Sequence, residues 1–273
     1  MTHTSQTTMA TARSHDGTEI AYFTSGDGPP LVLVHGVLGD HTRWDALRPH
    51  LEPHVTVQAM DRRGRGASGD AAEYAVTREF EDVAAVVEAV AGSTGSAVDV
   101  YGHSGGASFA LGAAALTSNI RRLVLYEPAV DSAELLPDRL LERLDQLLEA
   151  GDPEAVVETF CREVLHMDQQ QIDAYRDQPS WPRRVAAAHT LARELRIPAG
   201  QLVDAERTAG VTVPVLMLEG SQTPEGFKSG TRVVAGLLPD ARVEVLDGHG
   251  HTADVLGPEI VASLVLGFLH EPA

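Results

Sequence analysis

The segment Gly102-His103-Ser104-Gly105-Gly106 places a serine hydroxyl among glycines, at a spacing that suits nucleophilic chemistry. The apolar run at 98–101 before it is typical of a strand, and the Ala- and Leu-rich run at 107–116 after it predicts a helix. Such a sharp turn needs small residues two positions before and after its apex, because larger side chains would strike the neighbouring elements. We therefore predict that Ser104 lies exposed at the apex, with the Gly105 N–H ready to donate to an oxyanion.

Three further polar residues, His35, Asp61 and Glu127, each follow directly on a short apolar run that predicts a strand. Ligands of open parallel sheets bind at the carboxyl ends of the strands. We therefore expect these side chains at the same edge of the sheet as Ser104. The twelve histidines include no H-E-x-x-H spacing, so a zinc site is not indicated.

Strand and helix patterns alternate through most of the chain, which predicts an α/β fold with a mostly parallel sheet and helices on both faces. The expected strands are 18–23, 31–34, 55–60, 98–101, 122–126, 213–218 and 242–246. The expected helices between them are 42–50, 78–91, 107–116, 227–237 and 258–269.

The alternation stops between 129 and 210, where only helical spacing of Leu, Val and Ala is found, at 138–150, 153–165, 169–175 and 181–195. This pattern predicts a helical insertion. The expected organisation is a core made of residues 1–128 and 211–273, with the insertion at 129–210.

The composition narrows the possible partners and compartments. The chain has 21 basic and 39 acidic residues, so nucleic acid and anionic membranes are not expected as partners. Cys161 is the only cysteine, so no intrachain disulfide can form. The polar first fifteen residues contain no apolar signal region, and no run of about 18 apolar residues occurs. We expect a soluble, cytoplasmic monomer or homodimer with a frayed polar start.

Six motifs in a fixed order resemble the α/β-hydrolase superfamily, over residues from about Thr18 to Leu269. They are HGVLG, MDRRGRGASG, VYGHSGG, LVLYEP, VPVLMLEG and GHGH, the last followed seven residues later by Pro258. The resemblance implies the α/β-hydrolase fold, in which a helical cap stands where the insertion lies.

The same resemblance implies a catalytic triad of serine, acid and histidine, in which Ser104 is the nucleophile and His251 the general base. His251 keeps the family's spacing to Pro258, and His249 in the same loop is the competing base. The oxyanion hole is expected from the N–H groups of Val37 and Gly105.

The acid departs from the commoner family pattern, which places an aspartate three residues after Gly220, where this chain has Thr223. A hydroxyl cannot supply the negative charge that orients the imidazole. Glu127 is the favoured acid, because it follows a strand at the position that some family members use. The alternatives are Glu219, Asp247 and Asp254.

Other residues are expected to support the site or to line it. His35 and Gly36 belong to the oxyanion loop, and Asp61 resembles the family's loop-fixing aspartate. The substrate pocket is expected to include Leu38, His103 and Trp181, and the low aromatic content of 5% favours a largely aliphatic lining.

The resemblance and the motifs together predict a serine hydrolase that cleaves an ester-type bond of a small, largely apolar molecule through an acyl-enzyme. Carboxylic esters, lactones and thioesters are the candidate substrates, and no metal or cofactor is expected. A serine nucleophile argues against haloalkane or epoxide opening, for which this superfamily uses an aspartate. The alternative is a non-hydrolytic relative, namely a cyclase, a lyase, a cofactor-free perhydrolase or a ligand-binding protein, which the missing acid at Thr223 supports.

Overall fold

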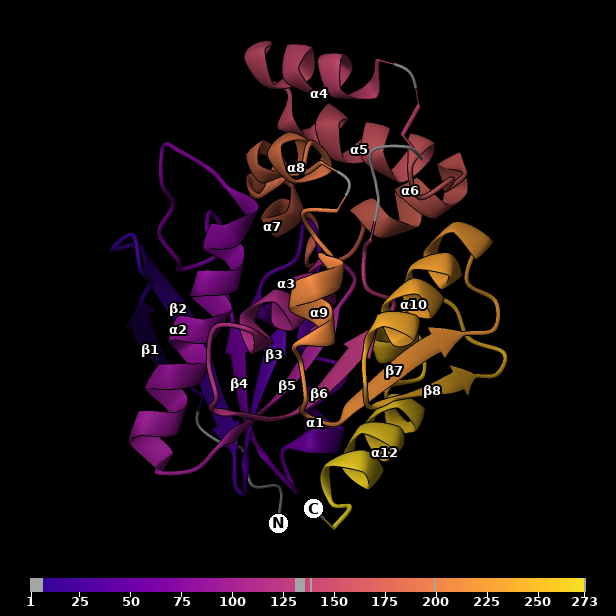
Figure 1. The fold of residues 1–273 in the computed structure, drawn as a ribbon. Helices are drawn as coiled ribbons and strands as arrows, with labels where there is room; N and C mark the ends of the chain where they lie inside the picture. Colours follow the sequence, from indigo (N-terminus) through magenta and orange to yellow (C-terminus); the bar gives the residue numbers. More distant parts are fainter. Residues whose placement is uncertain (1–6, 131–135, 138, 199, 273) are drawn as a thin grey trace, which may run out of the picture.

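The computed structural model describes residues 7–130, 136–137, 139–198 and 200–272. Eight strands form one sheet in the order β1-β2-β4-β3-β5-β6-β7-β8 (Figure 1). Their bounds are β1 Thr8–Arg13, β2 Glu19–Gly26, β3 Pro30–Val34, β4 Thr56–Met60, β5 Val98–His103, β6 Ile120–Tyr126, β7 Val215–Gly220 and β8 Ala241–Leu246.

The sheet is parallel from β4 to β8, and antiparallel where β2 pairs with β1 and β4. Its register aligns the strand ends that matter for chemistry. Val34 pairs with Gly102, and His103 pairs with Tyr126, so the residues that follow β3, β5 and β6 emerge at one edge. The expected mostly parallel α/β sheet is confirmed.

Helices cover both faces, because alternate residues of the central strands point to opposite sides. Val32 and Val34 pack in a cluster with α2 and α3, whereas Leu31 and Leu33 pack in a second cluster with α12. The helices of these two layers are η1 His41–Trp44, α1 Arg48–Leu51, α2 Val76–Thr94, α3 Gly105–Ala114, α9 Ala205–Ala209, α10 Glu225–Leu237, α11 Ala253–Leu256 and α12 Pro258–Leu269. Within the described ranges, no helix is both long and apolar enough to cross a bilayer.

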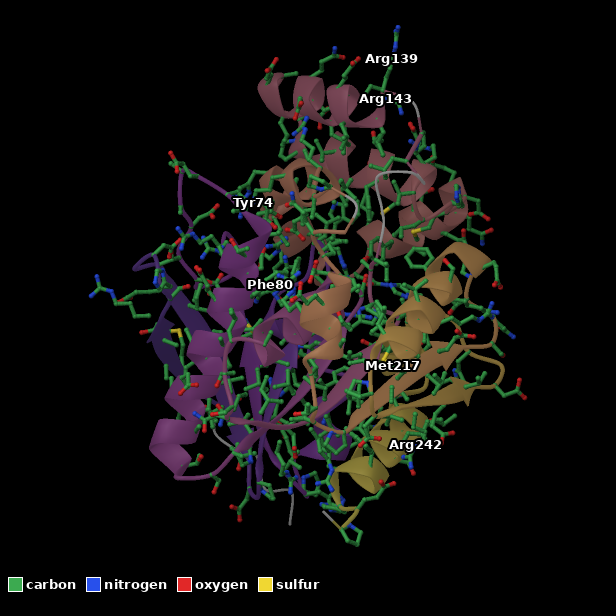
Figure 2. All side chains as sticks on the ribbon, viewed as in Figure 1. Tyr74, Phe80, Arg139, Arg143, Met217 and Arg242 are labelled. Atoms are coloured by element: carbon green, nitrogen blue, oxygen red, sulfur yellow. The ribbon has the colours of Figure 1, made fainter. Side chains whose placement is uncertain are left out.

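Of the six helices described between β6 and β7, all but α9 gather above the sheet at the top of Figure 1, and we call these five the cap helices. They are α4 Leu140–Glu149, α5 Pro153–Glu163, α6 Gln169–Arg176, α7 Trp181–Ala186 and α8 Ala188–Leu195. Their apolar faces form a third cluster, which also includes Leu38 from the loop after β3. Figure 2 shows the contrast between layers: Phe80 and Met217 lie inward, while Arg139 and Arg143 project from the outer end of the cap.

Three expectations about local structure need correction. The start of the chain is not frayed throughout, because Thr8–Arg13 forms β1 and pairs with β2. Only Ala12 of this strand is buried, so the strand is held by backbone pairing with β2 and its sequence shows no apolar pattern. The expected helix at 42–50 is two short pieces, η1 and α1, and α1 has a proline in its first turn. The expected helix at 181–195 is interrupted at Ala187, whose φ of −85° and ψ of −2° lie outside regular helix values.

Candidate active site

Ser104 occupies the apex of the turn between β5 and α3 in a strained conformation, with φ of 56° and ψ of −128°. The flanking glycines are sterically required. A Cβ on Gly102 would lie 2.6 Å from the Ala107 Cα, and a Cβ on Gly106 would lie 2.2 Å from the Val34 carbonyl oxygen. The small residues before and after the apex therefore let the strand, the turn and the helix pack together.

Backbone strain concentrates at the carboxyl ends of three neighbouring strands. Leu38 near the end of β3, Ser104 after β5 and Glu127 after β6 all have positive φ, at 55°, 56° and 45°. Non-glycine residues rarely adopt this region, and such residues cluster at functional sites. The conformation of these three residues marks this edge of the sheet as the candidate site.

Glu127 is fully buried and connects two segments of the site. Its Oε1 accepts a hydrogen bond from the Gly220 N–H at 2.7 Å, and its Oε2 accepts one from His251 Nδ1. This contact places the imidazole proton on Nδ1, so Nε2 is free to accept another proton. The His251 ring centroid lies 4.6 Å from that of His103, the residue before Ser104. Among the described residues, no hydrogen bond joins the Ser104 hydroxyl to His251.

The other candidate acids have different partners. Glu219 approaches Arg232 at 3.6 Å, Asp254 pairs with Arg43 at 2.7 Å, and Asp247 accepts a hydrogen bond from Ser221 at 3.3 Å. Burial raises the pKa of Asp254. Thr223 is buried, and its hydroxyl has no partner among the described residues. The structure thus brings Glu127, of the four carboxylates, to His251.

Aromatic residues hold the loop that carries His251. The His103 Nε2 donates to the His251 carbonyl oxygen at 2.7 Å, and burial together with the charge of His251 holds the His103 pKa well below its usual value. Tyr126 donates its hydroxyl proton to Gly250 and accepts from the Ala253 N–H at 3.3 Å. The loop is therefore fixed by buried groups on β5 and β6.

Phe227 and the alternative base His249 both lie near His251 but have different contacts. Phe227 on α10 lies against the His251 ring, with centroids 4.7 Å apart. The His249 ring instead packs against Gly257, where an added Cβ would lie 2.5 Å from its Cε1. Among the described residues, His251 and not His249 forms the hydrogen bond with Glu127, which distinguishes the two histidines of this loop.

The loop after β3 and the first residue of α3 each present a backbone N–H group near Ser104. His35 Nδ1 donates to the Gly36 carbonyl oxygen at 2.8 Å, and its Nε2 accepts from the Arg62 N–H at 3.1 Å. Burial, aided by the nearby charge of Arg62, holds the pKa of His35 well below its usual value, so the ring is neutral. In the described part of the chain, the N–H groups of Val37 and Gly105 have no acceptor. These two groups can receive a negative oxygen.

Asp61 fixes the glycine-rich loop after β4. Its Oδ1 accepts from the N–H of His41 at 2.7 Å and from its Nδ1 at 2.8 Å, and its Oδ2 accepts from the Ala67 N–H at 2.8 Å. Asp40, His41 and Asp61 are close enough to hold a metal ion. Both Asp61 oxygens already have donors, and Asp40 pairs with Arg183 and Thr42, so hydrogen bonding accounts for this cluster.

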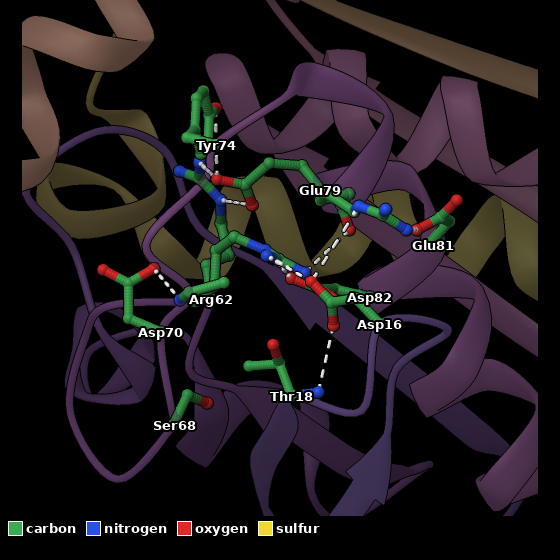
Figure 3. Close-up of polar contacts among 12 residues, drawn as sticks. Asp16, Thr18, Arg62, Ser68, Asp70, Tyr74, Glu79, Glu81 and Asp82 are labelled. Atoms are coloured by element: carbon green, nitrogen blue, oxygen red, sulfur yellow. Dashed lines mark hydrogen bonds and ion pairs between the residues drawn. The ribbon is translucent and has the colours of Figure 1, made fainter.

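A buried ion-pair cluster joins the core to the cap beside the oxyanion loop. Arg62 contacts Glu79 of α2 through two hydrogen bonds, at 3.0 and 2.7 Å, with Tyr74 next to Glu79 (Figure 3). Arg62 also reaches Glu194 of α8 at 2.9 Å, and Glu194 pairs with Arg65 as well. Glu194 is therefore the cap carboxylate that balances two buried arginines of the core.

We expect Glu194→Gln to lower the free energy of unfolding by about 3 kcal/mol, because it leaves buried arginine charge without its partner. Urea titration measures this loss. Burial alone would raise the pKa of Glu194, but Arg62 and Arg65 lower it to about 2. A carboxylate whose pKa is lower in the folded than in the unfolded state stabilises the fold at pH values above its unfolded pKa of about 4.5. The difference in the free energy of unfolding between wild type and Glu194→Gln should therefore become smaller as the pH falls from about 4.5 towards 2.

The matched control is Asp145→Asn, which breaks the exposed pair with Arg196 on the cap surface. Such exposed pairs contribute up to about 1 kcal/mol. Equal losses from Glu194→Gln and Asp145→Asn would show that the buried cluster does not hold the cap.

A small cavity of about 20 Å³ lies between the oxyanion loop and the cap. Leu38 lines it, as expected, whereas His103 packs on the His251 loop and Trp181 is buried among the cap helices. The lining residues are Leu38, Gly39, Asp40, Thr42, Arg43, Ser180, Arg183 and Arg184. The pocket roles of His103 and Trp181 stay predictions.

Sequence reasoning missed the groups that support His251 and those that line the cavity. Tyr126 had a detectable signal, because it is the one polar side chain that ends the apolar run before Glu127. Arg183 and Arg184 form the only adjacent arginine pair between 129 and 210, which was also visible. Phe227 had no such signal, because single aromatic residues on amphipathic helices are common.

Comparisons with known proteins identify the family of this chain. The Alpha/beta hydrolase family matches residues 31–264. An alpha/beta hydrolase from Sphaerobacter thermophilus of known structure is 36% identical, covers 95% of this chain and 100% of its own, and superposes with a TM-score of 0.82.

Two curated relatives are more distant in sequence. The 2-(acetamidomethylene)succinate hydrolase of Mesorhizobium japonicum is 27% identical over 89% of both chains. The (E)-2-((N-methylformamido)methylene)succinate hydrolase of Acinetobacter baylyi is 22% identical over 91% of this chain and 93% of its own. With the strained serine turn, the sheet order and the family match in agreement, the chain belongs to the alpha/beta hydrolase family and is a hydrolase.

Proposed function

We propose that this protein is a serine hydrolase in which Ser104, His251 and Glu127 form the catalytic triad. The observation that carries the proposal is the hydrogen bond from His251 Nδ1 to the buried Glu127, at the sheet edge where Ser104 is held with positive φ. A carboxylate in this position orients the imidazole and stabilises its protonated form. The other candidate acids are less suited to orient His251, because each of them has another partner. These acids are Glu219, Asp247 and Asp254.

In the proposed mechanism, the Ser104 oxygen attacks a carbonyl carbon while His251 Nε2 takes the hydroxyl proton. The N–H groups of Val37 and Gly105 stabilise the tetrahedral oxyanion. His251 then returns the proton to the leaving group, and an acyl-enzyme on Ser104 remains. Water, activated by the same histidine, releases the acid product and restores the serine.

The proposed substrate is a small molecule with a largely apolar carbon skeleton and an ester-type bond, such as a carboxylic ester, lactone or thioester. Val37 and Leu38 pack with the apolar cluster of the cap helices, which supports an apolar contact beside the oxyanion hole. The two curated relatives are named for substrates that carry acetamido or formamido groups, so amides belong in the same test panel.

Hydrolysis in water enriched in ¹⁸O tests the proposal on a panel of esters, lactones, thioesters and amides. We expect one ¹⁸O atom in the carboxylic acid product, because water enters when the acyl-enzyme is released. Rearranged or cyclised products without the label would instead support a cyclase or lyase. Binding without any turnover would support a ligand-binding protein.

The cap residue Trp181 is expected to affect selectivity for acyl-chain length. Trp181 packs in the same cluster as Leu38, and its Nε1 donates to Glu154 at 3.1 Å. We expect Trp181→Ala to change kcat/KM for short and long esters unequally, because pocket shape discriminates between chain lengths. The ratio of the two values is measured, since partial unfolding lowers both equally. Leu144→Ala, also in the cap cluster, is the control, and an equal change for all chain lengths in Trp181→Ala would contradict the prediction.

A further inference from the structure

Arg184 on α7 is a half-buried cation that forms no ion pair with a carboxylate among the described residues. Its guanidinium carbon lies 4.3 Å from the centroid of the Tyr175 ring, and its Nε donates to the Ser180 hydroxyl at 3.4 Å. Among the described residues of the cap, the exposed Arg139 and Arg162 also have no carboxylate partner, whereas five other arginines each contact a carboxylate. These pairs are Arg143 with Glu163, Arg176 with Glu158, Arg183 with Asp40, Arg193 with Asp70, and Arg196 with Asp145.

Arg122 is also buried without a carboxylate partner among the described residues, but it donates to three backbone carbonyl oxygens, whereas Arg184 donates to a single hydroxyl. Burial lowers the pKa of Arg184, Tyr175 and the more distant Asp40 oppose this shift, and the charge of Arg43 adds to it. An arginine remains protonated in proteins, so this shift reports a charge that would gain from an anion beside it. The aromatic ring of Tyr175 offsets part of that cost but supplies no negative charge.

Arg184 lines the cavity between the cap and the oxyanion loop, together with Arg43 and Arg183. The other two guanidinium groups are already balanced. Arg43 pairs with Asp254 at 2.7 Å, and Arg183 pairs with Asp40 at 3.3 Å. The cavity therefore keeps one uncompensated positive charge, that of Arg184.

The loop after β3 connects the cavity with the reacting serine. Leu38 and Gly39 line it, and Gly36 of the same loop approaches Ser104 so closely that an added Cβ would lie 3.4 Å from its Oγ. A volume of about 20 Å³ holds one water-sized group. A substrate held in the oxyanion hole could thus extend a small anionic group towards Arg184.

We propose that Arg184 is a specificity-determining residue that binds a carboxylate of the substrate, next to the bond that Ser104 attacks. The inference rests on the proposed function and names its substrate class: small esters or amides whose acyl part carries a carboxylate. A guanidinium forms charge-assisted hydrogen bonds with a carboxylate oxygen, and a cavity of about 20 Å³ admits one such oxygen. A phosphate dianion fits less well, because Asp40 and Asp254 stand beside the same cavity.

The test compares 4-nitrophenyl hemisuccinate with 4-nitrophenyl pentanoate, which have acyl chains of similar length and differ in charge. We expect wild type to prefer the hemisuccinate. Arg184→Gln should lower the ratio of the two kcat/KM values by about 10- to 100-fold, because a hydrogen bond to a charged group is lost. Arg184→Lys should recover part of the ratio, since it keeps the charge without the planar fork.

Arg196→Gln is the matched control, because it removes the same charge from an exposed position on the cap that pairs with Asp145. This variant should leave the ratio unchanged. Inhibition of pentanoate hydrolysis by succinate gives an independent measurement in wild type and in Arg184→Lys, and it does not depend on the folding of Arg184→Gln. Succinate should inhibit wild type competitively and the lysine variant more weakly.

Two results would overturn the inference: no preference of wild type for the hemisuccinate together with no inhibition by succinate, or an unchanged ratio in folded Arg184→Gln. These outcomes differ from failure of the proposed function. If the function is right and the inference wrong, wild type still hydrolyses the pentanoate and Ser104→Ala does not. If the function is wrong, wild type hydrolyses neither ester.

Discussion

Ser104→Ala is expected to abolish turnover while the protein remains folded. The change removes one hydroxyl at the apex of the turn and no packing, and alanine meets the same backbone strain at φ of 56° as serine does. Loss of the nucleophile alone costs on the order of 10⁶ in kcat in a serine protease. The rate that remains should reflect the oxyanion hole and substrate binding, about 10³ to 10⁴ above the reaction in water.

Steady-state kinetics on the best ester of the panel and a thermal melt of both proteins check this prediction. Ser229→Ala is the control, because it removes a hydroxyl from the exposed face of α10. If Ser104→Ala hydrolysed that ester at the wild-type rate, another residue would have to be the nucleophile.

Glu127→Gln is expected to lower kcat by at least about 100-fold, and a comparable change in the best-studied triad costs about 10⁴. The amide oxygen of glutamine can still accept the Gly220 N–H, as Oε1 of Glu127 does at 2.7 Å. Its NH₂ group then faces His251 Nδ1, which favours the imidazole tautomer that protonates Nε2. The variant thus keeps the shape of the site and loses both the charge and the correct tautomer.

Glu219→Gln is the matched control, because Glu219 is the last residue but one of the neighbouring strand β7 and its carboxylate pairs with Arg232. Glu219→Gln should lower kcat much less than Glu127→Gln does. Thr223→Ala should also leave kcat within a few-fold, because the buried Thr223 hydroxyl contacts no partner among the described residues. A larger loss in Glu219→Gln than in Glu127→Gln would overturn the choice of acid.

The sequence predicts the sheet well for a physical reason. Parallel strands buried on both faces read as continuous apolar runs, such as Leu31 to Val34, and each ends at a polar residue that can be assigned to one edge. β1 cannot be predicted in this way, because its residues are mostly exposed and its position depends on backbone pairing with β2.

Long-range pairing limits what the sequence reveals about the site. Glu127 and Glu219 end adjacent strands, and neither residue type nor spacing distinguishes them. Contacts between distant parts of the chain distinguish them. His251 hydrogen-bonds to Glu127, 124 positions away in the chain, whereas Arg232 lies near Glu219. The cavity shows the same limit. Few aromatic residues predicted an aliphatic lining, yet three arginines line it, and only the fold reveals that Arg184 lacks a carboxylate among the described residues.

The most direct test of the central claim is to locate the adduct that a fluorophosphonate probe forms with the protein. The probe phosphonylates a serine activated by a histidine base, so peptide mass spectrometry identifies the nucleophile itself. We expect one adduct, on the peptide that contains Ser104, with no labelling of Ser104→Ala and much slower labelling of Glu127→Gln. An adduct on another serine, or an unlabelled wild-type protein that still hydrolyses esters, would contradict the assignment of Ser104 as the nucleophile.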